Sequence, residues 1–110
     1  MIEKRRYPRI PVRYDVVYRD ISAKIDEKKR AIVENASRLG LKIKFSGMLK
    51  KNDLLDLAIY KSPASEPINA YGKVIWEKDS ALVYGEKEAG IFLTKVGWTE
   101  TAKLVNPYMD

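Results

Sequence analysis

Cysteine and histidine are both absent from this chain of 110 residues. Without cysteine there is no disulfide framework, no thiolate nucleophile and no sulfur-ligated metal. Without histidine, neither a Ser-His-Asp nor a Cys-His catalytic arrangement can form, and the commonest zinc ligand and near-neutral general base are both missing. We therefore expect a protein that is not an enzyme and that carries no metal and no cofactor.

Long apolar runs are also missing. The N-terminus lacks the run of about 7–15 apolar residues that a secretory signal needs, and no stretch approaches the ~20 apolar residues of a membrane span. We expect a soluble, cytoplasmic protein without a membrane span. What the chain has in excess is positive charge, because 21 Lys and Arg residues against 15 Asp and Glu residues give a net charge of +6. This excess favours anionic partners, which include nucleotides, nucleic acids and acidic proteins.

The chain length fits one domain, and alternating apolar and polar residues along it are typical of half-buried strands. Turn signals separate the alternating segments at Gly47, around residues 62–67 and around residues 85–88. Several short strands with this spacing predict an all-β barrel or sandwich. The expected strands cover about residues 12–19, 29–34, 39–45, 55–59, 68–78 and 90–96.

Aromatic residues and a C-terminal segment complete the expected fold. Tyr14 and Tyr18 lie on the apolar face of the first strand and are expected in the core, and Val74 and Trp76 are expected to share a face. Residues 99–109 predict a short helix with Thr99 as its N-cap, limited in length by a proline at position 107. Trp98 is expected to pack this helix on the strands.

Residues 1–11 predict a flexible arm ahead of a single domain formed by residues 12–110. Pro8 and Pro11 each remove a backbone donor and disfavour both a helix and a central strand. The arm carries a basic cluster of Lys4, Arg5, Arg6 and Arg9.

Two short motifs suggest guanine recognition. Arg5 and Arg9 form an RxxxR pair, and a guanidinium fork matches the O6 and N7 acceptors of guanine. About 26 residues later, Asn35, Ser37 and Gly40 form an NxSxxG motif at the end of a strand-like run. Asn35 and Ser37 project to the same side if the chain there is extended, and Gly40 permits a turn or a close backbone approach.

Each motif has an alternative interpretation. The basic cluster could be a solvated tail, and Asn35 and Ser37 could cap a turn through bonds to nearby backbone. A second RxxxR pair, Arg9 and Arg13, has the same spacing. We favour Arg5 and Arg9, because Arg13 lies within the alternating first strand, opposite its apolar face.

The order and context of the two motifs resemble the PilZ domain family, and later segments at residues 72–76 and 89–92 look like that family's final strands. This resemblance implies a six-stranded antiparallel β-barrel of PilZ type with a C-terminal helix. It also implies a non-enzymatic receptor for the bacterial second messenger cyclic di-GMP that relays its signal to an unidentified downstream protein. The implied ligand-binding residues are Arg5, Arg9, Asn35, Ser37 and Gly40, with Lys4 and Arg6 as possible phosphate contacts and Trp76 as a possible stacking platform.

Two other functions compete with this one. A domain with the PilZ fold could act as a protein-interaction module with little or no nucleotide affinity. A basic β-barrel could instead bind single-stranded nucleic acid on a cationic surface with aromatic stacking positions. We expect no nucleic-acid partner, because Tyr14 and Tyr18 fall on the apolar strand face.

Overall fold

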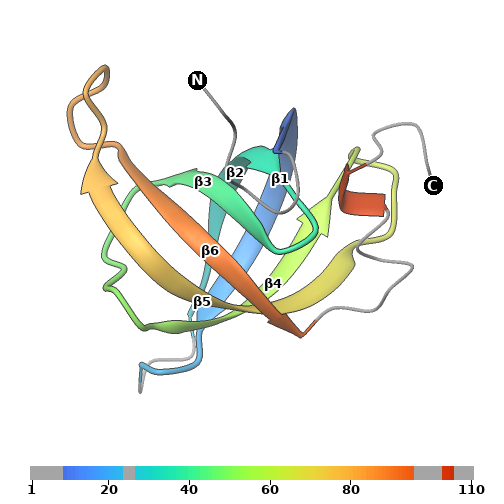
Figure 1. Ribbon diagram of the computed structural model, residues 1–110, viewed down its shortest axis with the longest axis horizontal. Helices are drawn as coiled ribbons and strands as arrows, with labels where there is room; N and C mark the ends of the chain where they lie inside the picture. Colours follow the sequence, from blue (N-terminus) through green and yellow to red (C-terminus); the bar gives the residue numbers. More distant parts are fainter. Residues whose placement is uncertain (1–8, 24–26, 96–102, 106–110) are drawn as a thin grey trace, which may run out of the picture.

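The computed structural model describes residues 9–23, 27–95 and 103–105. In this part of the chain, six antiparallel strands close into a barrel, and residues 103–105 lie in a short helix near the C-terminus (Figure 1). The predicted all-β barrel with a C-terminal helix is therefore confirmed. The strands are β1 (Ile10–Asp20), β2 (Lys28–Ala36), β3 (Gly40–Phe45), β4 (Leu54–Tyr60), β5 (Ile68–Asp79) and β6 (Lys87–Lys95).

The barrel consists of two halves, each made of three consecutive strands. The order around the barrel is β1-β2-β3-β6-β5-β4, so β1 to β3 form one meander and β4 to β6 form the other. Two pairings between distant strands join the halves, β3 with β6 and β1 with β4. We call these pairings the β3–β6 seam and the β1–β4 seam. An ion pair crosses each seam, Lys42 to Glu88 at 3.5 Å and Arg19 to Asp56 at 3.2 Å.

The barrel interior is filled by the inward residues of all six strands. Tyr14, Val16 and Tyr18 of β1 are buried, as the alternation predicts. Leu104 of the short helix is fully buried, and the Tyr14 hydroxyl donates a hydrogen bond to the Leu104 carbonyl oxygen at 3.3 Å. This contact fixes the helix against the first strand. Trp98, Thr99 and most of the predicted helix lie outside the described residues.

Several predicted strand boundaries were wrong by one to three residues, among them the starts of β1, β3 and β6. β1 begins at Ile10, inside the expected arm, and Pro11 is accommodated where the register with β2 shifts, so its missing N–H breaks no regular ladder. β3 begins at Gly40, and Leu39 is 42% exposed in the preceding turn. β6 begins at Lys87, because Lys87 and Glu88 pair with the end of β5.

Trp76 also differs from the prediction. Val74 is fully buried, but the register between β5 and β6 shifts between Val74 and Trp76. Such a β-bulge adds one residue and turns the following side chains to the other face. Trp76 therefore pairs with Gly90 and lies half-buried on the outer face, away from Val74.

Candidate functional site

Asn35 is the first residue of the NxSxxG motif, and it lies in the described part of the chain. It is the second-last residue of β2, half-buried on the outer face, and it pairs with Pro11 of β1 and Lys42 of β3. The register between β2 and β3 shifts just before it, between Val33 and Asn35. This irregularity lets both Glu34 and Asn35 occupy the outer face, and bulges of this kind often lie next to functional sites.

Glu34 and Asn35 each hold a buried oxygen to which no described residue donates a hydrogen bond. Neither Oε1 of Glu34 nor Oδ1 of Asn35 has a hydrogen-bond partner among the residues that the structure describes. The other oxygen of Glu34, Oε2, lies 3.7 Å from Nζ of Lys44. Buried acceptors are nearly always paired in folded proteins, so an unpaired one needs an explanation. These two neighbouring acceptors fit a ligand that brings hydrogen-bond donors.

Asn35 belongs to a row of residues that crosses the outer face of the barrel. Lys42 pairs with Asn35 on one side and with Gly90 of β6 on the other, and Gly90 pairs with Trp76 of β5. A side chain at position 90 would overlap the indole of Trp76, so the absence of one lets this ring lie over the strand. The fold thereby brings Asn35 and Trp76, 41 residues apart in the sequence, onto one surface.

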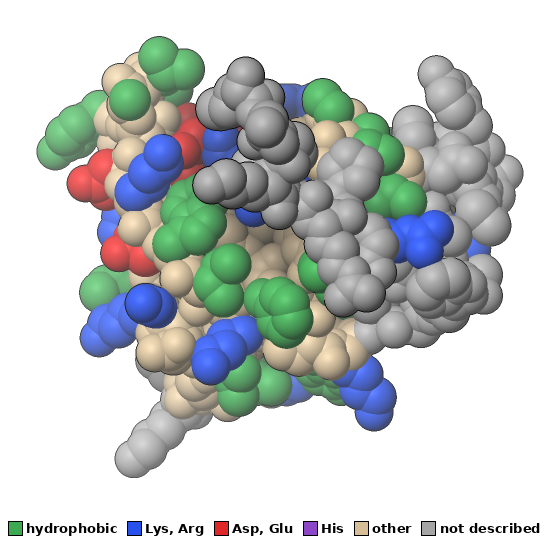
Figure 2. All heavy atoms as spheres, viewed as in Figure 1, with side chains coloured by type: hydrophobic (Ala, Val, Ile, Leu, Met, Phe, Trp, Pro, Cys, Tyr) green, Lys and Arg blue, Asp and Glu red, His purple; other side chains and the backbone are tan. Residues whose placement is uncertain are grey.

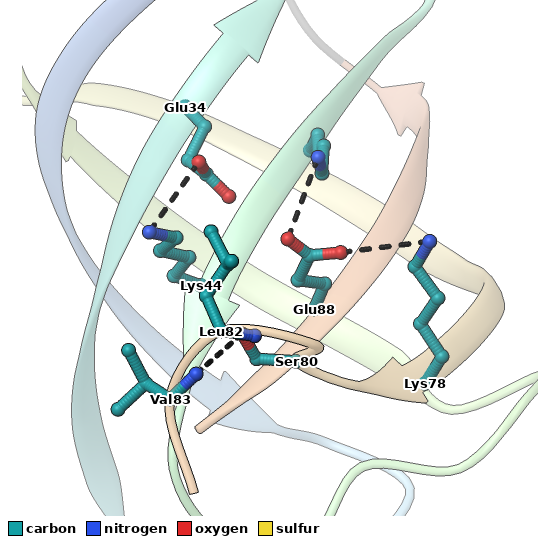
Figure 3. A network of polar contacts seen from close by, with 8 residues as sticks. Glu34, Lys44, Lys78, Ser80, Leu82, Val83 and Glu88 are labelled. Carbon is teal, nitrogen blue, oxygen red and sulfur yellow. Dashed lines mark hydrogen bonds and ion pairs between the residues drawn. The ribbon is translucent and has the colours of Figure 1, made fainter.

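The lysine within this row, Lys42, and a second lysine, Lys78, share one carboxylate. Glu88 lies 3.5 Å from Lys42 and 3.7 Å from Lys78, so one carboxylate serves both ammonium groups (Figure 3). Nζ of Lys78 lies 5.7 Å from the centroid of the Trp76 ring, within the range of a cation–π contact. One ammonium group therefore lies over the indole and a second, on Lys42, lies in the same cross-strand row, so the surface suits an anionic ligand with flat rings.

Ser37 is buried and acts within the turn that links β2 to β3. Its Oγ accepts hydrogen bonds from the amides of Leu39, at 3.3 Å, and Gly40, at 3.2 Å. Its own amide donates to the Gly40 carbonyl at 2.9 Å. The hydroxyl makes local bonds to the turn backbone, as the turn-cap alternative predicted. Ser37 thus fixes the corner from which Asn35 and Arg38 extend.

Gly40 is required by a close backbone approach. A Cβ atom built at this position would lie 2.6 Å from the Ile91 carbonyl oxygen across the β3–β6 seam. Since that neighbour is backbone, it cannot move aside easily. The predicted close approach is the reason for this glycine, and its φ is not in the left-handed region.

The two arginine motifs are only partly described. Arg9 is half-buried and directly precedes Ile10, which pairs with Ala36, so the register brings Arg9 to the end of β2 beside the Ser37 turn. Arg13 is exposed on the outer face of β1. Arg5, Lys4 and Arg6 lie outside the described residues.

Lys42, Gly90 and Glu34 were missed by sequence reasoning. The signal for Gly90 was a glycine inside a strand pattern, which often marks a close approach. No sequence pattern marked Lys42 or Glu34 as site residues, because the residues beside them in the site come from other strands.

Neither a metal-binding group nor a helix long and apolar enough to span a membrane is present among the described residues. Residues 9–23, 27–95 and 103–105 contain no group of three or more His, Cys, Asp or Glu side chains that could hold a metal ion. In the same ranges, every helix is too short or too polar to cross a bilayer.

Comparison with known proteins identifies similar structures. The Bacillus subtilis inhibitor of motility (MotI/DgrA) has a TM-score of 0.78 at 16% identity over 94% of this chain and 49% of its own. The PilZ domain of YcgR from Escherichia coli, solved with c-di-GMP, has a TM-score of 0.72 at 14% identity over 93% of this chain and 86% of its own. The K. pneumonia MrkH–c-di-GMP complex has a TM-score of 0.65 at 14% identity, over 94% and 50%.

These identities are low, so the likeness to solved structures shows the fold. The chain spans about half the length of MotI/DgrA and of MrkH. None of the curated proteins matches the chain. The family model of the PilZ domain, however, matches residues 3–88. Because this match covers most of the chain and the barrel has the same fold as the solved PilZ structures, the chain belongs to the PilZ domain family.

Proposed function

We propose that this chain is a non-enzymatic receptor that binds cyclic di-GMP on the outer face of the barrel and relays the signal to a protein partner in the cytoplasm. Membership of the PilZ family supports this function, as do the fold neighbours YcgR and MrkH, both solved with c-di-GMP. The single observation that carries it is the pair of buried acceptors on Glu34 and Asn35 that have no partner in the described part of the chain.

The two acceptors match the edge of guanine that offers donors. Guanine presents N1–H and the N2 amino group side by side, and a carboxylate accepts from both better than an amide does. Asn35 replaces the aspartate that is frequent at this motif position, so it offers one carbonyl acceptor and no charge. Glu34, adjacent in sequence and also on the outer face, would supply the missing carboxylate. We include Glu34 in the proposed site.

The remaining residues have complementary roles. Arg5 and Arg9 would hold guanine O6 and N7, Lys4 and Arg6 would contact phosphate, and Trp76 would stack on a base. Ser37 and Gly40 would act by shaping the corner, since the hydroxyl is bonded within the turn and the glycine permits the seam contact. Lys78 lies near the indole and Lys42 lies in the same cross-strand row, and both would attract the phosphates.

Titration calorimetry with cyclic di-GMP, and with GTP as the comparison, tests this function. Arg5→Ala or Arg9→Ala should weaken binding by about 1–3 kcal/mol, the value of one bidentate guanine contact. Glu34→Gln and Asn35→Ala should also weaken it. Arg13→Ala is the matched control, because Arg13 is an exposed arginine of β1 outside the motif.

Absence of heat with either nucleotide would contradict receptor function and favour a PilZ-fold protein-interaction module. Loss of binding in Arg13→Ala with retention in Arg5→Ala would instead overturn the motif assignment alone. We also propose that bound cyclic di-GMP orders the arm of residues 1–11 against the corner formed by Asn35 and Ser37. Amide hydrogen exchange tests this ordering, since protection should rise mainly at residues 4–13 and 35–40 when cyclic di-GMP is added. Residues 1–8 lie outside the described residues, so this ordering is a prediction.

A further inference from the structure

Aromatic side chains and lysines alternate on the outer face of β3, β5 and β6. Three aromatic residues lie in successive cross-strand rows, each with a lysine in the same row. Trp76 shares its row with Lys42 across Gly90, Phe92 pairs with Lys73, and Tyr71 pairs with Lys95. We call these six residues the aromatic–lysine face. Figure 2 shows hydrophobic side chains gathered over this side of the barrel with Lys and Arg side chains around them.

Positive charge dominates this face. On β3, β5 and β6, its rows and the neighbouring row of Lys44, Glu88 and Lys78 hold five lysines and one acidic residue. On β4, Asp56 pairs with Tyr71, and its carboxylate lies 3.2 Å from Arg19 of β1. Glu88 pairs with Lys42 and Lys78, and Lys44 pairs with Glu34 of β2. Lys73 and Lys95 make no ion pair with the residues that the structure describes. No described carboxylate therefore offsets the charge of the two lysines beside the exposed rings of Phe92 and Tyr71.

The rings on this face are accessible. Tyr71 is 44% exposed and Phe92 is 43% exposed, while Trp76 is half-buried after the β5 bulge turns it outward. The three rings come from the adjacent strands β5 and β6, so they lie on one continuous surface. The sequence argument against nucleic-acid binding relied on Tyr14 and Tyr18, which are indeed buried. That argument did not consider Tyr71, Trp76 and Phe92, which the pairing of β5 with β6 brings together on the outer face of the barrel.

We propose that the aromatic–lysine face binds single-stranded nucleic acid, with bases stacked on Tyr71, Phe92 and Trp76 and phosphates held by Lys42, Lys73 and Lys95. Sheet surfaces with exposed aromatic residues on adjacent strands recognise single strands in this way, because every unpaired base offers a flat ring. An acidic protein surface would satisfy the lysines but leave the rings without stacking partners. Four of the six residues lie outside the proposed cyclic di-GMP site, so the two functions can be tested separately.

Fluorescence anisotropy of the full chain with a labelled oligo-dT of about 16 nucleotides tests the proposal. The wild-type chain should bind it and should bind a duplex of the same length more weakly, because paired bases cannot stack on side chains. Phe92→Ala and Tyr71→Ala should each weaken binding about tenfold. Lys73→Gln should lower both the affinity and the dependence of affinity on salt, since it removes one phosphate contact.

Tyr84→Ala is the matched control, because Tyr84 is a fully exposed tyrosine at the tip of the β5–β6 hairpin, outside the aromatic–lysine face. It should bind oligo-dT like the wild type. Thermal unfolding of each variant verifies that the barrel is intact. Lack of oligo-dT binding by the wild type at low salt would overturn the proposal. So would equal affinity for poly-glutamate with no effect of Phe92→Ala or Tyr71→Ala, a result that would assign the face to acidic protein partners.

Discussion

Tyr14 and Tyr18 show how identical residues in one strand differ in energetic role. Both are buried side chains on the inner face of β1. The Tyr14 hydroxyl donates to the Leu104 carbonyl, whereas the Tyr18 hydroxyl has no hydrogen-bond partner within the described ranges. Removing a paired hydroxyl leaves its acceptor unsatisfied, and removing an unpaired one relieves a desolvation cost.

We therefore expect opposite outcomes for two equivalent substitutions. Tyr14→Phe should lower the free energy of unfolding by about 0.5–1.5 kcal/mol, because the Leu104 carbonyl loses its donor. Tyr18→Phe should leave it unchanged or raise it slightly. Urea denaturation of both variants measures the difference. Equal losses would show that the Tyr18 hydroxyl is paired in solution.

The same tyrosines predict a loss of stability in alkali. Burial raises the pKa of Tyr14 above its usual value of 10.0. Burial also raises the pKa of Tyr18, with smaller contributions from the nearby charges of Asp20 and Glu27. Above pH 10 the unfolded chain loses these protons before the folded chain does, so ionisation favours unfolding.

The contribution of these two tyrosines to stability should thus be fully present below pH 10.0 and should be lost as the pH rises above this value. The free energy of unfolding, measured in urea at a series of pH values, tests this expectation. Tyr18→Phe should reduce the slope above pH 10. A slope that stays the same in this variant would show that other groups cause the loss.

The turn between β2 and β3 is the element that shapes the proposed site. Ser37 holds it through two accepted hydrogen bonds and one donated by its own amide. Ser37→Ala should therefore cost about 1–2 kcal/mol of stability, because two amides lose their acceptor. Cyclic di-GMP affinity should fall as well, since Asn35 precedes the turn.

Thermal unfolding and calorimetry on the same sample separate these effects. Arg9→Ala is the comparison, because it should reduce affinity with little change in stability. A Ser37→Ala variant with normal stability and lost binding would contradict the positioning role, and would favour direct contact between the hydroxyl and the ligand.

Strand identity could be predicted from the sequence, but the placement of side chains on the outer face could not. Alternation revealed all six strands because it is a local property. The β-bulges near Asn35 and Trp76 arise from pairing between strands, so a strict period of two placed Trp76 on the same face as Val74. Leu39 was assigned to a strand because its apolar side chain matched the alternation, although it lies exposed in the Ser37 turn.

The candidate site was predicted in part for the same reason. Asn35, Ser37 and Gly40 lie close together in the sequence, so a motif could point to them. Lys42 joins Asn35 through the pairing of β2 with β3, and Gly90 joins Lys42 through the β3–β6 seam, which no local pattern encodes. Sequence reasoning therefore predicted the residues at the corner of the proposed site but not Lys42 and Gly90 beside it.

At the scale of the whole molecule, the two three-stranded halves are joined along two seams. Within each half, consecutive strands pair as hairpins, so each pairing closes only a short loop. Each seam joins strands that are far apart in sequence, so its formation carries a larger loss of chain entropy. The halves should form before the seams close.

This order of assembly has a kinetic consequence for Gly40, whose backbone lies against Ile91 across the β3–β6 seam. Gly40→Ala should accelerate unfolding and leave the refolding rate nearly unchanged, because a contact that forms after the transition state affects only the unfolding rate. Stopped-flow measurements over a range of urea concentrations test this. Slower refolding would place the β3–β6 seam in the folding nucleus.

The row from Asn35 to Trp76 crosses this late-forming seam, with Asn35 in one half and Trp76 in the other. A ligand that contacts both residues would link the two halves of the barrel across the β3–β6 seam, along which the barrel opens. Native-state hydrogen exchange of β3 and β6 amides would then slow with bound ligand more than exchange in the β4–β5 hairpin. The lifetime of the closed barrel would rise with ligand concentration, so the bound receptor would also be degraded more slowly than the free one.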